Sequence, residues 1–388
     1  MLSQAARAPL TNVAEPRPDP WLLGAALLLV TLGLLMVTSA SLPLAETQPF
    51  RYLIRQAVAL ILGVGGAAMV LTVPLERWSR ASPWLLLLAL VLLVLVLVPG
   101  VGREVNGSSR WLPLGPFNLQ VSELAKLFAL IYVASYLQRH AAEFYASMHS
   151  LLRLMFVLGT MAMLLLLEPD FGTTVVLAAA ALGMMFLAGI RMGRFLLLQA
   201  VVLFGMLLLV YSSDYRWQRM TNFIDPWSVR YEDGYQLVQA LIATGRGGLF
   251  GVGLGESLQK HHYLPEAHTD FLFAVLAEEL GLVGVLVVLA LFGVIVWRAF
   301  TIAGRAQDRE HPFAANLAHG LGLLFALQAL VNIGVNMGML PTKGLTLPFL
   351  SYGGSSLVVM CLSLGLLLRC GLEANPPEDP PQPEEGAP

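Results

Sequence analysis

Ten apolar stretches of roughly membrane-spanning length constrain the fold of this chain more than any other feature. A helix crosses the hydrocarbon core of a bilayer with about 20 apolar residues. Only 12% of the residues are charged, about half the share of roughly 25% in a soluble domain. We therefore predict an all-α polytopic integral membrane protein with about ten transmembrane helices, and we exclude an ordinary soluble enzyme. The stretches lie at about 21–40, 53–72, 84–99, 120–137, 152–168, 172–190, 195–212, 271–297, 313–338 and 352–370.

The remaining segments predict two tails around one transmembrane unit at 21–370. The h-region of a cleavable signal peptide has only about 7 to 15 residues. The first stretch is longer, so we expect it to be retained as a span after an N-terminal tail at 1–20. The C-terminal tail at 371–388 is rich in prolines and acids from Asn375 onward and is predicted to be disordered.

Arginines beside the stretches predict the orientation, because cytoplasmic loops are enriched in Lys and Arg. With a cytoplasmic N-terminus and an even number of spans, both termini are cytoplasmic, and a large loop at about 213–269 lies outside, between spans seven and eight. The formal net charge of −2 gives no global basic field, so no nucleic-acid partner is predicted. The cytoplasmic arginines in this orientation are Arg7, Arg17, Arg77, Arg80, Arg139, Arg153, Arg191, Arg194, Arg298, Arg305, Arg309 and Arg369.

Two polar outer segments place the expected function on the outer face. The segment at 99–119 is rich in Gly, Pro, Asn and Ser and contains the pair Arg110 and Trp111. The loop at 213–269 contains an amphipathic piece from Tyr235 to Thr244, with Gln236 on one side. This piece is either a helix that lies on the bilayer surface or the roof of a site.

Ionisable residues at membrane depth are informative, because placing one there costs roughly 2.5 to 3.5 kcal/mol. Glu123 and Lys126 lie at the start of the fourth stretch, beside Ser122. Their i,i+3 spacing puts them on one helix face, where they can neutralise each other. They are either a buried structural pair or part of the lining of a polar cavity, to which Ser122 is also assigned.

Polar residues also enter the outer end of the eighth stretch, at His268, Thr269 and Asp270. One interpretation is that Asp270 is a simple N-cap, where free amides and the helix dipole stabilise an acid. In the other, the carboxylate lies at the mouth of a cavity and accepts a proton from a sugar hydroxyl. Glu278 and Glu279 follow deeper in the helix, and at least one of them is expected to face protein or water.

The segment at 340–356 joins the last two stretches and contains two prolines and three glycines. This composition predicts a non-helical re-entrant backbone, which membranes tolerate only where it is buried in protein or lines a wet cavity. Lys343 either pairs with a phosphate or extends to the interface. Tyr352 and Ser355 belong to the same segment and are further candidates for the cavity.

Metal and nucleotide chemistry find little support in the pattern. His261, His262 and His268 form a loose cluster with Glu266, but the chain has no HExxH or CxxC spacing, so no dedicated metal site is predicted. P-loop, Rossmann and serine-elbow motifs are also absent from the sequence. The glycine-rich strip at 245–255 is either a phosphate cradle or an ordinary set of turns.

Three long motifs make the chain similar to a known family. The stretches GSSRWLPLGPFNLQVSELAK, YQLVQALIATGRGGLFGVGLGESLQKHHYLPEAHTDFLFAVLAEELG and MLPTKGLTLPFLSYGGSS resemble the SEDS (shape, elongation, division, sporulation) family of lipid II polymerases. The resemblance covers essentially all ten stretches. The sequence segments PTKGLTLP and SYGGSS resemble the septal FtsW branch more than the elongation branch, RodA.

The resemblance implies an inverting peptidoglycan glycosyltransferase that polymerises lipid II into β-1,4 glycan strands at the outer face of the inner (cytoplasmic) membrane, during septal cell-wall synthesis in cell division. By motif position, Asp270 matches the essential aspartate of the family. Glu123 and Lys126 match its fourth-span ion pair, and Arg110 matches its exterior-loop arginine.

A mechanism follows from this resemblance. Asp270 is expected to act as general base on the 4-hydroxyl of the acceptor sugar, which displaces undecaprenyl pyrophosphate from the donor chain. The leaving group needs cationic neutralisation, a role open to Arg110, Lys343 or a divalent cation such as Mg²⁺ or Mn²⁺. No other cofactor is predicted.

The resemblance also implies partners and leaves two rival functions. The expected partners are lipid II and the nascent glycan chain, membrane lipids, a class B penicillin-binding protein acting as septal transpeptidase, and the bitopic division regulators FtsQ, FtsL and FtsB. One rival is a lipid II flippase, against which the chain shows no evident internal repeat and gathers its polar motifs on one side. The other is a non-catalytic divisome scaffold, in which Asp270 would be dispensable.

Overall fold

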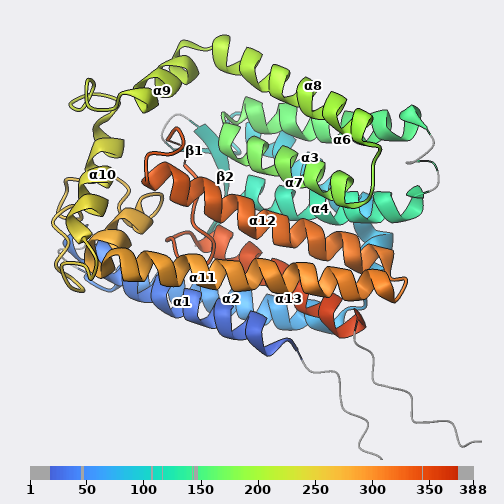
Figure 1. Ribbon diagram of the computed structural model, residues 1–388, viewed down its shortest axis with the longest axis horizontal. Coiled ribbons are helices and arrows are strands. Elements are labelled where there is room, and N and C mark those ends of the chain that lie inside the picture. Colours follow the sequence, from blue (N-terminus) through green and yellow to red (C-terminus); the bar gives the residue numbers. More distant parts are fainter. Residues whose placement is uncertain are drawn as a thin grey trace, which may run out of the picture.

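Ten long helices form the bundle in the computed structural model, which describes residues 18–44, 48–105, 108–115, 117–141, 143, 147–342 and 344–374. They run side by side along one axis (Figure 1), and each coincides with one of the ten apolar stretches. The predicted tails lie mostly outside the described residues. The helices are α1 Pro20–Ser41, α2 Arg51–Thr72, α3 Leu75–Leu97, α4 Val121–Arg139, α6 Met148–Leu167, α7 Phe171–Leu187, α8 Met192–Tyr211, α11 Leu272–Asp308, α12 Pro312–Asn336 and α13 Gly354–Ala374.

Length and composition support membrane crossing for most of these helices. Within the described ranges, eight are long and apolar enough to span a bilayer. The other two are α7, which is apolar but has only 17 residues, and α4, which contains Glu123, Lys126 and Arg139. The all-helical polytopic fold is confirmed, and the count of ten spans stays a prediction at α4 and α7.

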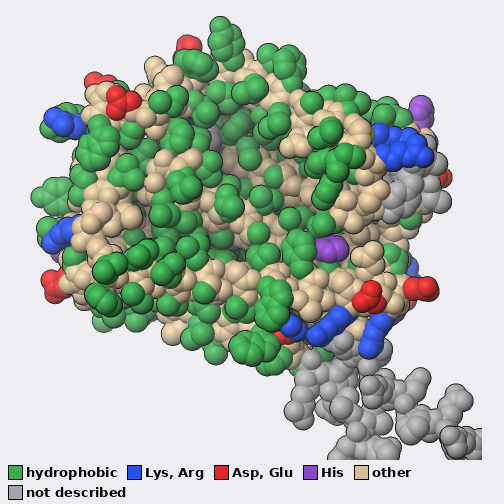
Figure 2. Space-filling view, in the orientation of Figure 1, with side chains coloured by type: hydrophobic (Ala, Val, Ile, Leu, Met, Phe, Trp, Pro, Cys, Tyr) green, Lys and Arg blue, Asp and Glu red, His purple; other side chains and the backbone are tan. Residues whose placement is uncertain are grey.

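The outside of the bundle has the character of a lipid-facing surface. Large apolar side chains are exposed along the helices, for example Leu28 of α1, Phe156 of α6 and Leu207 of α8. Figure 2 shows hydrophobic side chains over the middle of one face, while charged side chains gather toward its two ends. The first helix begins and the last helix ends at the same end of the bundle (Figure 1), as the predicted shared side of the two termini requires.

Short elements cover the opposite end of the bundle (Figure 1). Strands β1 Arg103–Val105, β2 Ser108–Leu114 and β3 Phe117–Gln120 form an antiparallel sheet in the order β1-β2-β3. Helices α9 Asp214–Ile224 and α10 Tyr235–Gly247 and the 3₁₀ turn η1 Leu42–Leu44 complete this end. The sequence did not predict the sheet, because its strands are short and interrupted by Gly and Pro. Pairing of Trp111 with Gln120 places the end of the sheet at the start of α4.

Helix α11 contains a break at Gly281, where φ is +66° and ψ is −164°. The helix before the break, 272–280, is almost entirely buried. A Cβ atom on Gly281 would lie 2.3 Å from the backbone nitrogen of Gly251, and one on Gly247 would lie 1.9 Å from the Ala277 carbonyl oxygen. Gly247 and Gly251 of the strip at 245–255 thus allow close backbone packing on α11, while Gly248, Gly253 and Gly255 have the positive φ of turn residues. No residue of the strip lines the cavity described below.

Two ion pairs, each made by a buried acid, fix the same region. Glu278 accepts from Arg246 at 2.8 Å, and Glu279 accepts from Lys260 at 2.9 Å. Ser39 at the end of α1 donates to both Glu279 oxygens, at 2.7 and 2.9 Å. Both acids are essentially unexposed, so each faces protein, as expected for at least one of them.

Replacing Gly281 with alanine is expected to destabilise the protein by roughly 1 to 3 kcal/mol, because this backbone region is accessible essentially to glycine alone. The Cβ would also collide with the Gly251 backbone. Thermal unfolding in detergent measures the effect. Gly293→Ala is the matched control, since it lies in the same helix and its Cβ would have no neighbour within 4 Å. Equal melting temperatures for the two variants would contradict the expectation.

Candidate functional site

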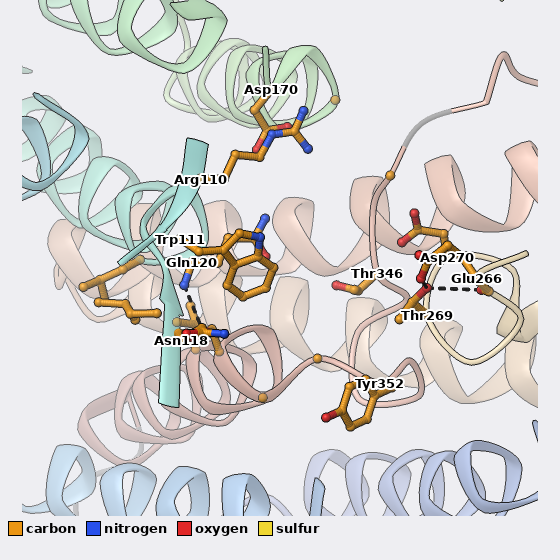
Figure 3. Close-up of a pocket in the computed structure, with 18 of the residues that line it drawn as sticks. Arg110, Trp111, Asn118, Gln120, Asp170, Glu266, Thr269, Asp270, Thr346 and Tyr352 are labelled. Carbon is orange, nitrogen blue, oxygen red and sulfur yellow. Dashed lines mark hydrogen bonds between the residues drawn. The ribbon is translucent and has the colours of Figure 1, made fainter. Parts of the chain in front are cut away.

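A cavity of about 1100 Å³ lies at the end of the bundle that carries the sheet, α9 and α10. Its walls come from segments that are far apart in the sequence (Figure 3). The polar and charged residues that line it are Arg55, Arg110, Asn118, Gln120, Asp170, Arg216, Arg219, Gln236, Glu266, Thr269, Asp270, Thr342, Thr346, Tyr352 and Ser355. A cavity of this size, in which these residues lie among apolar ones, can accept a large, charged substrate headgroup.

Asp270 lies in the cavity wall, immediately before α11. It does not cap that helix: the N-cap position is Phe271, whose own side chain makes no capping hydrogen bond. Within the part of the chain that the structure describes, no residue donates a hydrogen bond to the Asp270 carboxylate. The N-cap interpretation is therefore wrong, and the carboxylate is directed at the cavity instead (Figure 3).

The surroundings of Asp270 raise the pKa of its carboxyl to about 7. Burial contributes most, because it removes the charged form from water, and the Glu266 carboxylate adds to the shift. Arg110 and Arg219 oppose it. Thr269 donates to the Glu266 carboxylate at 2.7 Å, which holds this second acid beside the first. A carboxyl with a pKa near neutrality is suited to take up a proton from a hydroxyl.

Arg110 extends from strand β2 to the corner between α6 and α7. Its Nε donates to the carbonyl oxygen of Glu168 at 3.1 Å, and its Nη2 donates to that of Pro169 at 2.5 Å. The corner itself is set by Asp170, which caps α7 by accepting from the Thr173 amide. Arg110 is thus fixed in place while lining the cavity opposite Asp270 (Figure 3).

Glu168, at the same corner, has a fully buried side chain. Among the described residues, neither of its carboxyl oxygens has a hydrogen-bond partner. Burial, and next the Asp170 carboxylate, raise the pKa of Glu168 to about 8, although Arg110 opposes the shift. The carboxyl is therefore neutral at pH 7, which removes the cost of an unpaired buried charge.

Glu123 and Lys126 form a buried ion pair of 2.8 Å behind the cavity wall. Lys126 also donates to Gln328 at 2.9 Å, and Ser356 donates to Glu123 at 3.4 Å. Neither residue lines the cavity, and neither does Ser122, which is fully buried. The interpretation that these three residues line the cavity is therefore wrong. Helix α4 packs them inward against α12 and α13, so the ion pair supports the site from behind its wall.

Of the other predicted site residues, some line the cavity and others pack behind its wall. Gln236, Thr269, Tyr352 and Ser355 line the cavity. Ser355 also joins α13 to strand β3, accepting from the Gln120 amide and donating to the Asn118 carbonyl. His268 packs behind the wall, with its ring 4.9 Å from Tyr52 and 5.5 Å from Tyr352, and burial lowers its pKa. Lys343 lies outside the described residues.

Several lining residues were not predicted as site residues. Arg55 of α2 and Arg216 and Arg219 of α9 line the cavity, where Arg219 donates to the Thr342 carbonyl at 3.2 Å. The i,i+3 spacing of the α9 arginines on an outer segment was the available signal. With Arg110 they bring four arginines to a wall that carries three acids, so anionic groups are favoured there.

No group of three or more His, Cys, Asp and Glu side chains in the described ranges could hold a metal ion. The histidine cluster at 261–268 is therefore not assembled as a ligand set. Among the described residues, the positively charged side chains that line the cavity are arginines.

The chain matches, over residues 20–375, the family model described as "Cell cycle protein" and named for FtsW, RodA and SpoVE. It is 50% identical over 366 residues to a "Probable peptidoglycan glycosyltransferase FtsW" of Allochromatium vinosum, covering 94% of this chain and 92% of the relative. It is 53% identical over 371 residues to a protein of the same description from Nitrosococcus halophilus, covering 94% of this chain and 95% of the relative.

Solved structures agree with this relationship. A chain from work on "structural coordination of polymerization and crosslinking by a peptidoglycan synthase complex" superposes with a TM-score of 0.76 at 31% identity, covering 92% of this chain and 98% of that one. The rod shape determining protein RodA of Thermus thermophilus superposes with a TM-score of 0.68 at 32% identity, covering 91% and 96%. The sequence matches and the shared fold establish that this chain belongs to the SEDS family of cell cycle proteins, which includes FtsW, RodA and SpoVE.

Proposed function

We propose that this protein is a peptidoglycan glycosyltransferase of the FtsW type, which polymerises lipid II into β-1,4 glycan strands at the outer face of the cytoplasmic membrane. The observation that carries this proposal is the Asp270 carboxylate, with a pKa near 7, in the wall of a cavity of about 1100 Å³ that also presents four arginines. The relatives described as FtsW support the same activity.

In the proposed reaction, ionised Asp270 accepts the proton of the acceptor sugar's 4-hydroxyl as its oxygen attacks the anomeric carbon of the donor chain. The bond from that carbon to the pyrophosphate oxygen breaks, and undecaprenyl pyrophosphate leaves with the electron pair. One displacement converts an α-linked pyrophosphate into a β-1,4 bond, so a single base is sufficient. Pyrophosphate is a good leaving group, so the reaction needs positive charge more than a protonating acid.

That charge is available on the cavity wall. Arg110, Arg216 and Arg219 line it, and the N-terminus of α13 meets it at Gly354. The free amides of a helix N-terminus favour anions. Lys343, which lies outside the described residues, is a further proposed contact. Mg²⁺ or Mn²⁺ is an alternative proposed source of positive charge, since proteins often hold such an ion through one or two carboxylates together with substrate phosphates.

Septal action and a transpeptidase partner belong to the same proposal. The two relatives named above are described as FtsW, and the structural match at a TM-score of 0.76 comes from a peptidoglycan synthase complex. We therefore propose location in the inner membrane at the division septum, with a class B penicillin-binding protein as partner and FtsQ, FtsL and FtsB as regulators.

Purified protein in proteoliposomes with lipid II tests the proposal, alone and with its transpeptidase. Glycan chains should form, and their length can be measured on gels. A flippase would instead move lipid II between leaflets without forming chains. A scaffold would do neither. Absence of chains under both conditions would overturn the proposed activity.

The polymerisation rate is expected to rise with pH through about 7. Asp270 must be ionised to act as a base, and below its pKa of about 7 the protonated form dominates. The rate at pH 6 should thus be about one tenth of its plateau at high pH. Glu266→Gln removes a charge that raises the pKa of Asp270. In this variant the rise of the polymerisation rate with pH should therefore occur at lower pH. Rates that stay constant between pH 5.5 and 8 would contradict the assignment.

A further inference from the structure

Two asparagines on α12, Asn332 and Asn336, reach the cavity end of the bundle without lining the cavity. Their i,i+4 spacing puts them on one helix face, and both are buried, at 2% and 0% exposure. A buried amide in an apolar helix is costly unless it is hydrogen-bonded. Both side chains meet that requirement, and the groups they bind lie around Asp270.

The two amides converge on one atom, the backbone carbonyl oxygen of Asp270. Asn332 Nδ2 donates to it at 3.0 Å, and Asn336 Nδ2 donates to it at 2.9 Å. Asn336 Oδ1 also accepts from the Ala274 amide at 3.1 Å, in the first turn of α11. The backbone on both sides of Phe271 is therefore held by α12.

Asn332 ties Asp270 to the opposite wall as well. Its Nδ2 donates to the Leu345 carbonyl oxygen at 2.5 Å, on the non-helical segment between α12 and α13. The adjacent Gly344 approaches so closely that a Cβ there would lie 3.1 Å from Asp270 Oδ2. One side chain thus fixes both the backbone of Asp270 and the loop that bounds its carboxylate.

We propose that Asn332 and Asn336 are positioning residues, which fix the backbone of Asp270 and so aim its carboxylate at the acceptor hydroxyl. The inference rests on the proposed function, in which Asp270 is the base. The N-cap residue Phe271 makes no capping hydrogen bond of its own, and among the described residues no donor holds the Asp270 carboxylate itself. The backbone clamp therefore fixes the position of the Asp270 backbone, from which its side chain extends to the cavity. Neither asparagine touches the cavity, so they act through Asp270 and not on the substrate.

Asn332→Leu is nearly isosteric and removes the donors to Asp270 and Leu345 together. A displacement of about 1 Å in a reacting group costs about 10²-fold in rate. We expect kcat for lipid II polymerisation to fall by at least tenfold, while KM stays within about twofold, because the lining of the cavity is unchanged. The pH at which the rate reaches half of its plateau should also move, since the displaced Asp270 carboxyl would have different neighbours. Asn332→Gln, which keeps the amide donor, should restore part of kcat.

The matched control is Asn316→Leu, the same substitution near the other end of α12, beside a small pocket remote from Asp270. It should leave kcat, KM and the pH midpoint unchanged. Thermal unfolding in detergent measures the folded fraction of every variant. If Asn332→Leu does not fold, Asn332→Gln and Asn336→Gln serve for the same measurements, with a loss of kcat at constant KM expected for each.

Parallel assays of Asp270→Ala separate failure of this inference from failure of the proposed function. An inactive Asp270→Ala together with folded Asn332 variants of parental kcat and pH midpoint would overturn only the positioning role. Loss of activity in strict proportion to the folded fraction would also overturn it. Full activity of Asp270→Ala would overturn the assignment of Asp270 as the base, and the positioning role with it. Only the absence of chains from the parent protein would overturn the proposed function.

Discussion

Asp270→Ala and Asp270→Asn are expected to fold like the parent and to form no detectable glycan chains from lipid II. A positioned general base contributes roughly 10²- to 10⁴-fold to a rate. Neither alanine nor asparagine can take up the hydroxyl proton. Folding should survive because the contacts that place Asp270 use its backbone carbonyl, which both variants retain. The carboxyl itself lies against the cavity.

The measurement is chain formation in proteoliposomes, with thermal unfolding in detergent as the test of folding. Asp308→Asn is the matched control: it makes the same change at the exposed far end of α11, and it should polymerise at the parental rate. Near-parental chain formation by Asp270→Ala would remove Asp270 as the base.

Glu123→Ala is expected to destabilise the protein by roughly 3 to 5 kcal/mol, the usual cost of removing one partner from a buried ion pair. The variant leaves the Lys126 ammonium fully buried with Gln328 as its remaining described partner. It also removes the acceptor of Ser356, whose hydroxyl bonds to Thr346 in the cavity wall at 2.8 Å. We therefore expect a strongly lowered melting temperature and reduced polymerisation.

Two comparisons make the Glu123 result specific. Glu76→Ala breaks the exposed pair with Arg80, whose side chains are 77% and 71% exposed, and it should change the melting temperature little. Replacing Glu123 with Leu and Lys126 with Met together removes both buried charges and should recover most of the stability. A Glu123→Ala variant as stable and active as the parent would show that the pair does not support the site.

The fold could be predicted largely from the sequence because its dominant signal is local. A membrane-spanning helix must be continuously apolar over about 20 residues and satisfies its own backbone. Each of the ten stretches became a helix for this reason. The small sheet was missed because its strands, such as Arg103–Val105, are too short to show a period.

The candidate site could be predicted only in part. Charged residues in an apolar chain are few, so Arg110, Glu123, Lys126 and Asp270 stood out by residue type alone. Their roles did not follow from residue type. Asp270 and Glu123 are both acids at the outer ends of apolar helices, yet one lies in the cavity wall and the other is sealed behind it.

What the sequence by itself determined about this protein is its class, its helices and the small set of charges from which a site could be built. These depend on local composition and on the cost of placing a charge in hydrocarbon. Only the tertiary structure decided which charges meet in one cavity, that Arg216 and Arg219 join them, and that Asn332 and Asn336 hold Asp270. The physical reason is distance along the chain: Asp270 and its asparagines are 62 and 66 residues apart, and hydrogen bonds between such segments exist only once the helices have packed.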